Sequence, residues 1–179
     1  MTPPEYIQLK AFARIDGALL SLLFVAAFAC YVVGLKSPVY GLLALLTIVL
    51  TPVFVVVRLK RFRDEALLGK ISFRRAWFYV ALMFCYGGLR FALAQYAYLA
   101  YLDQGYMLMV ITEMLSTAET AELINQMGMT DQISESLHVL QNTRPIDFAL
   151  NMLMTVVLSG TMLGMPIAAV MQKKEKEIK

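Results

Sequence analysis

The chain has 179 residues, of which 59% are hydrophobic and 16% charged, and its mean hydropathy is +0.64. A soluble domain is about half apolar and about a quarter charged, so this composition indicates a protein whose solvent is lipid. Intrinsic disorder, nucleic-acid binding as a main activity and a disulfide-stapled secreted fold are therefore excluded. Two cysteines and one histidine leave little material for a metal centre, so we expect no metal and no cofactor.

Four apolar segments are long enough to cross a membrane, for which about 20 residues are needed. In chain order they are residues 15–33, 39–57, 76–102 and 146–170. Residues 34–38 connect the first two so briefly that these helices must form an antiparallel hairpin. The sequence therefore predicts an all-α integral membrane protein, with four transmembrane helices in a single membrane domain over residues 1–179.

The segment between the second and third helices, residues 58–75, is strongly basic. Its Asp64 and Glu65 are outnumbered by cations, and the candidate topology-setting or anionic-lipid-binding residues among them are Arg58, Lys60, Arg61, Arg63, Arg74 and Arg75. The positive-inside rule places such a loop in the cytoplasm, so both termini should be cytoplasmic in a bacterial inner membrane. The lysines of the C-terminal tail agree: Lys173, Lys174, Lys176 and Lys179.

Residues 103–145, on the opposite side, form the largest segment outside the membrane. Ser116 and Glu119 have the spacing of a capping box, and Gly128 supplies a stop for the helix that follows. Thr130 is a candidate cap for a second helix with an apolar face. We therefore expect a periplasmic insertion of two short amphipathic helices, lying on the membrane or over the bundle as a lid.

Arg90 is the one unambiguous charge well inside a predicted membrane span, and such a residue is a functional-site hypothesis by default. The last helix carries a matching polar stripe of residues spaced four apart: Asp147, Asn151, Thr155 and Ser159. We expect Arg90 to face this stripe, with Asp147 as its charge partner. The pair of features is either polar packing between two helices or a small pocket for a phosphate or carboxylate. Near the inner end of the first helix, Arg14 and Asp16 are expected to neutralise one another.

Small residues predict where helices approach closely. Gly160 and Gly164 form a G-x-x-x-G pattern in the last helix, and Gly87 lies in the third. The pattern favours packing either within the bundle or between subunits, and the sequence does not choose between them. Catalytic motifs are absent, since no nucleophile elbow, phosphate loop or pair of acids at a plausible depth occurs, so we expect no catalytic residues and no enzyme activity.

Several short motifs resemble a small bacterial membrane family, chiefly from Bacteroidota, known as domain of unknown function 4199. They are Gly69-Lys70-Ile71-Ser72-Phe73, Tyr101-Leu102-Asp103, Glu122-Leu123, Met127-Gly128-Met129-Thr130, and the pair Gly160 and Gly164 before a lysine-rich tail. The resemblance implies a four-helix inner-membrane protein without an established reaction. It also implies an accessory role beside envelope glycosyltransferases that act on polyprenyl-phosphate carriers.

Two functions follow as expectations. The first is a non-catalytic accessory or scaffold protein that forms complexes with itself or with a membrane enzyme through small-residue helix faces. The second is a small transporter or lipid-binding protein that uses Arg90 and the polar stripe for an anionic head group. Membrane lipids are expected partners in both cases, and nucleic acid in neither.

Overall fold

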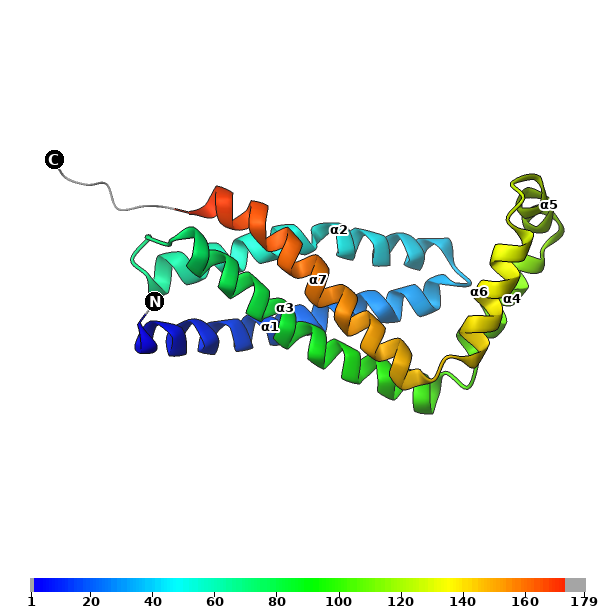
Figure 1. Ribbon diagram of the computed structural model, residues 1–179, viewed down its shortest axis with the longest axis horizontal. Coiled ribbons are helices and arrows are strands. Elements are labelled where there is room, and N and C mark those ends of the chain that lie inside the picture. The colour runs from blue at the N-terminus through cyan, green and yellow to red at the C-terminus, as the bar shows by residue number, and fades with distance from the viewer. Residues whose placement is uncertain (1, 173–179) are drawn as a thin grey trace.

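The computed structural model describes residues 2–172, so the C-terminal lysines that support a cytoplasmic tail lie outside the described residues. Four long helices form an elongated bundle, and three shorter helices stand at one end of it (Figure 1). The long helices are α1 (Pro3–Gly34), α2 (Pro38–Arg61), α3 (Phe73–Ala97) and α7 (Pro145–Met171). All four are long and apolar enough to cross a membrane, which confirms the four predicted spans.

The helices begin where the sequence provides a start. Pro3, Pro38 and Pro145 each occupy the first turn of a long helix, where the missing N–H group costs nothing. α1 therefore starts twelve residues before the predicted apolar span, and α2 continues into a π-helical segment, η1 (Phe62–Ala66). Gly69, with φ +80°, follows that extension, and its backbone amide donates to the carbonyl of Arg63. The membrane helices are thus longer than their hydrophobic stretches, since the polar first and last turns are helical as well.

α3 is the central helix of the bundle, with α1 on one side and α7 on the other. It holds the most buried residues of any helix, including Tyr79, Met83 and Phe84. α2 packs mainly on α1 and leaves most of its surface exposed. In a membrane the apolar side chains of α2 would contact lipid, so this surface does not have to be covered by another helix.

Glycines set the closest helix contacts, and they do so within the chain. A β-carbon on Gly160 would overlap the ring of Phe84 in α3, and one on Gly164 would lie 3.2 Å from Val80. On the other face of α3, Gly87 lies against Gly17 of α1. The choice left open by the sequence is therefore decided: the G-x-x-x-G pattern packs α7 onto α3.

The three shorter helices form what we call the insertion: α4 (Tyr106–Ser116), α5 (Ala118–Gln126) and α6 (Thr130–Asn142). The expectation of two helices was incomplete, because α4 is a third. Its sequence is as apolar as that of a membrane span, but Gly105, with φ +83°, separates it from the end of the preceding helical segment. The cap of α5 is Thr117 rather than Ser116, which is the last residue of α4.

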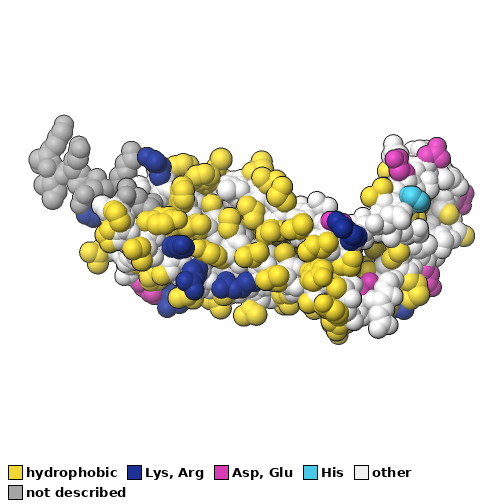
Figure 2. Space-filling view, turned by 60° about the horizontal axis from the view of Figure 1, so that its bottom comes forward, with side chains coloured by type: hydrophobic (Ala, Val, Ile, Leu, Met, Phe, Trp, Pro, Cys, Tyr) yellow, Lys and Arg dark blue, Asp and Glu magenta, His cyan; other side chains and the backbone are white. Residues whose placement is uncertain are grey.

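The molecule has two chemically different ends. Hydrophobic side chains cover the bundle between the two ends (Figure 2). Most Lys and Arg side chains on this face lie toward the end that holds the termini, whereas Asp and Glu side chains are exposed on the insertion at the other end. We call these the termini end and the insertion end. The insertion end contains the cavity described next.

Candidate functional site

A cavity of about 990 Å³ lies between the membrane helices at the insertion end. It is enclosed by the C-terminal parts of α1 and α3 and the N-terminal parts of α2 and α7. α7 crosses the bundle diagonally, so its N-terminal half lies away from α2 (Figure 1). Ligand pockets in proteins usually hold about 300–1,000 Å³, so this cavity is at the upper end of that range.

The inner wall of the cavity is aromatic. Phe91 of α3 packs against Phe24 and Phe28 of α1, with ring centroids 5.6 and 6.1 Å apart. Phe84 of α3 continues this wall toward the termini end. The outer rim includes Leu45 and Ile48 of α2, which are exposed and would face the surrounding lipid. The cavity is therefore apolar and partly open sideways, toward the interior of a bilayer.

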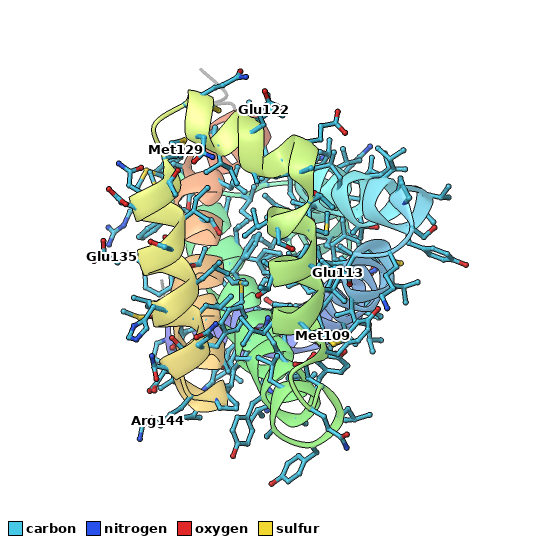
Figure 3. The ribbon with its side chains drawn as sticks, turned by 90° about the vertical axis from the view of Figure 1, so that its right-hand side faces the viewer. Met109, Glu113, Glu122, Met129, Glu135 and Arg144 are labelled. Atoms are coloured by element: carbon cyan, nitrogen blue, oxygen red, sulfur yellow. The ribbon has the colours of Figure 1, made fainter. Side chains whose placement is uncertain are left out.

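α4 and α6 provide a roof. Seen along the bundle from the insertion end, they lie side by side across the opening and α5 joins them at one side (Figure 3). Met107, Leu108 and Ile111 of α4 line the cavity, together with Leu140 of α6. Glu113, Glu122 and Glu135 are exposed on the outer surface of the insertion. The insertion thus has an apolar inner surface and an acidic outer one, and of the two expected positions it takes the one over the end of the bundle.

Gln95 is the most unusual residue of the cavity wall. Its side chain is only 1% exposed, and its Oε1 atom has no hydrogen-bond partner among the described residues. Nearby, Asp103 is 8% exposed and its Oδ1 atom accepts a hydrogen bond from the backbone amide of Met107 at 3.2 Å. That bond ties the end of the third membrane span to the start of α4. Asp103 therefore positions α4, whereas the Oε1 atom of Gln95 is a buried acceptor without a donor.

The polar stripe of α7 is divided between two environments. Thr155 and Ser159 line the cavity, whereas Asp147 and Asn151 lie on a shallow polar surface next to His138 of α6. Asp147 pairs with Arg144, whose Nε atom lies 2.7 Å from Oδ2. The spacing correctly predicted one helical face, but that face passes from the surface into the cavity as α7 enters the bundle.

The expected contact between Arg90 and this stripe is wrong. Arg90 donates from Nη1 to the backbone carbonyl of Arg14 in α1, at 3.2 Å. Side chains in a helix point toward its N-terminus, so Arg90 extends back toward the termini end, away from the cavity. It is exposed, and it does not line the cavity. Its guanidinium thus lies at the level of Arg14, which just precedes the apolar run of α1, and its depth in the bilayer is less than expected.

Asp16 also has a different partner from the expected one. It is 2% exposed, and Nε of Arg58 in α2 donates to its Oδ1 atom at 2.7 Å, while the hydroxyl of Tyr79 in α3 donates to Oδ2. Arg14 lies two positions from Asp16 and therefore on another face of α1, which is why the two do not pair. This polar cluster joins α1, α2 and α3, and Phe62 stacks on Tyr79 with ring centroids 4.6 Å apart.

A family model described as a protein of unknown function (DUF4199) matches residues 15–173. This match includes all four membrane helices and the insertion. The chain belongs to this family. No curated protein and no solved structure matches it. The family match confirms the resemblance seen in the short motifs and attaches no reaction to the DUF4199 fold.

The basic residues of this DUF4199 chain fall into two groups. Arg58, Arg63 and Arg75 have side chains that are 17%, 14% and 13% exposed and pair with Asp16, Asp64 and Glu5. Arg58 and Arg75 join helices at the termini end, whereas Arg63 pairs with its neighbour in the chain, and all three are poorly placed to contact lipid. Lys60, Arg61 and Arg74 are exposed and remain candidates for anionic-lipid contacts, although Arg61 also forms an exposed ion pair with Glu65 at 2.8 Å.

Sequence reasoning missed Gln95, the residue that most distinguishes the DUF4199 cavity. A single uncharged polar residue near the end of a membrane span is common and carries no spacing signal. One signal was present: Gln95 follows Phe91 by four positions, so both had to lie on one face of α3. Only burial without a partner separates it from an ordinary interfacial glutamine.

Proposed function

We propose that this chain is a non-catalytic lipid-binding membrane protein, which holds one hydrocarbon chain in the cavity beneath α4 and α6. The observation that carries the proposal is the cavity itself: about 990 Å³, with an aromatic inner wall and a rim of lipid-facing residues. Water finds few hydrogen-bond partners on such an apolar wall. An empty cavity, in turn, lacks the van der Waals contacts that an apolar occupant would make with the wall. A lipid chain entering sideways from the bilayer between α2 and α7 fills it at the lowest cost.

The proposal changes the expected lipid site in one respect. The sequence favoured an anionic head group held by Arg90, yet Arg90 contacts α1 outside the cavity. Thr155 and Ser159 remain in the proposed site as wall residues. Arg90 belongs to the lipid-facing surface of the termini end.

We further propose that the membrane is the inner membrane of a bacterium, as in the Bacteroidota members that the sequence resembles, with both termini in the cytoplasm. Exposed Lys60, Arg61 and Arg74 at the termini end support this orientation under the positive-inside rule. The insertion is then periplasmic, and the cavity draws on the outer leaflet of that membrane.

An accessory role beside a membrane enzyme, such as an envelope polyprenyl-phosphate glycosyltransferase, stays a prediction. The glycine faces that suggested complex formation are used for packing within the chain, so they no longer support it. Lipid binding has a specific observation in its favour, and it is therefore the function preferred here.

Two neighbouring positions of α7 offer a matched test. Ser159 lines the cavity, whereas Leu158 is 61% exposed on the lipid side of the same turn. Phenylalanine at position 159 would fill cavity space, and phenylalanine at position 158 would only enlarge the lipid-facing surface. Native mass spectrometry of the protein purified in mild detergent counts the lipids retained by each variant. Loss of one bound lipid in Ser159→Phe but not in Leu158→Phe is expected, and equal retention by both variants would contradict cavity binding.

A further inference from the structure

Several polar atoms of the cavity wall can only accept hydrogen bonds. Gln95 presents an Oε1 atom that no donor among the described residues reaches, although the side chain is 1% exposed. A buried carbonyl without a donor costs free energy, and such atoms in native proteins usually have a partner. Gln95 lines an apolar cavity, so a donor on the occupant that reaches this atom is the simplest partner for it.

Three hydroxyls of the wall already donate their protons to carbonyls of their own helices. Thr155 donates to the carbonyl of Asn151 at 2.9 Å, Ser159 donates to that of Thr155 at 2.7 Å, and Thr51 of α2 donates to that of Thr47 at 3.2 Å. A hydroxyl that donates to its own helix retains only lone pairs for other partners. All three hydroxyls therefore face the cavity as acceptors, from two helices on opposite sides of the opening.

The charge of the wall excludes an anion. No lysine or arginine is among the described residues that line the cavity, and Asp103 is the one carboxylate there. A phosphate or carboxylate entering this space would lose its hydration without gaining a cation, and it would be repelled by Asp103. A cation would also lose its hydration in this apolar space, with a single carboxylate in return, so the recognised part of the lipid is uncharged.

We propose that the cavity selects a neutral lipid whose head group donates hydrogen bonds, through a hydroxyl or an amide N–H, with Gln95 accepting one of them. An ester or ether oxygen cannot be the partner of Gln95 Oε1, because it only accepts. This inference rests on the proposed function, since it concerns the ligand of the same cavity. It assigns Gln95 as a specificity-determining residue and removes Arg90 from ligand recognition.

Three photoreactive probes test the inference on the full-length protein in detergent micelles. Each has the same 18-carbon chain with a mid-chain diazirine, and they differ only in the head: a primary alcohol, its methyl ether or an alkyl phosphate. Crosslinked peptides are mapped by mass spectrometry, and competition by unlabelled alcohol gives relative affinities. The variant is Gln95→Met, which keeps length and removes the acceptor, and its matched control is Gln132→Met on the exposed face of α6.

We expect the alcohol to label cavity peptides with about tenfold higher affinity than the ether or the phosphate. Gln95→Met should remove this preference while the ether still binds, and Gln132→Met should leave it unchanged. Equal labelling of the cavity by alcohol and ether in the unmodified protein would overturn the donor preference and leave lipid binding intact. Stronger labelling by the phosphate would overturn the neutral head group. Labelling of no cavity peptide by any probe would overturn the proposed function as well.

Discussion

Asp16 of α1 and Arg58 of α2 form an ion pair that the hydroxyl of Tyr79 completes from α3, so three membrane helices meet at one carboxylate. The pair lies toward the termini end, opposite the cavity. It joins α1, α2 and α3 at one point, while the cavity separates parts of the same helices at the insertion end.

Removal of one member of this pair should destabilise the bundle more than removal of both. Arg58→Met leaves a buried carboxylate without its cation, and the expected loss is on the order of 3 kcal/mol. Asp16→Leu combined with Arg58→Met should recover most of that loss, because no unpaired charge remains. Thermal unfolding of the two single variants and the double variant in one detergent provides the coupling energy. Additive effects of the two changes would show that the pair does not act as a unit.

Gly160 should be intolerant of even the smallest side chain. Gly160→Ala places a methyl group into the ring of Phe84, and an overlap in a packed interface costs about 1–3 kcal/mol. Gly41 of α2 is the matched control, since a β-carbon there has its nearest neighbour at 3.8 Å. Gly41→Ala should be neutral or stabilising by up to about 1 kcal/mol through helix propensity. The comparison requires unfolding midpoints in one detergent, and equal destabilisation by both changes would contradict the contact between α7 and α3.

Arg90 should be dispensable for lipid retention in the cavity. Its contact is with the carbonyl of Arg14 at the surface of α1, so Arg90→Leu should alter stability by no more than about 0.5 kcal/mol. The number of lipids retained in native mass spectrometry should equal that of the unmodified protein. A cavity lipid lost from this variant would restore the anionic site expected from the sequence.

The insertion should respond to lipid removal. α4 lines the cavity with Met107, Leu108 and Ile111 and has two buried residues, Met107 and Val110, whereas α5 and α6, which the structure describes in full, have none. Emptying the cavity removes apolar contacts from beneath α4, so hydrogen exchange over residues 106–142 should accelerate. Exchange in α3 should remain slow, which provides an internal control. Unchanged exchange in the insertion after delipidation would indicate that the roof does not contact the ligand.

The proposed orientation makes the two ends of the molecule differ in chemical accessibility. With Cys30 and Cys85 replaced by alanine, a cysteine at Glu135 of α6 should react with a membrane-impermeant maleimide added to spheroplasts. A cysteine at Glu65 near the termini end should react only after the membrane is permeabilised. Both positions are exposed, so a difference in labelling reports topology. The reverse pattern would place the termini outside and the cavity in the inner leaflet.

Hydropathy, prolines and glycines were sufficient to predict the four helices, their hairpin and the helical insertion. These features depend on the transfer of each segment into lipid and on local backbone preferences, which are properties of residues close together in the chain. The spacing of Thr155 and Ser159 likewise predicted a shared helical face. The helix α4 was not predicted.

The sequence by itself determined that four segments of this chain are long and apolar enough to cross a membrane, and which residues share a face of each helix. Only the tertiary structure decided that Asp16 meets Arg58, that Arg90 reaches Arg14, and that Gln95 is buried without a donor. These relationships depend on how each helix is rotated, tilted and shifted in depth against its neighbours. That arrangement follows from the packing of many side chains at once, above all at Gly87 and Gly160, so no local pattern around Gln95 or Arg90 encodes it.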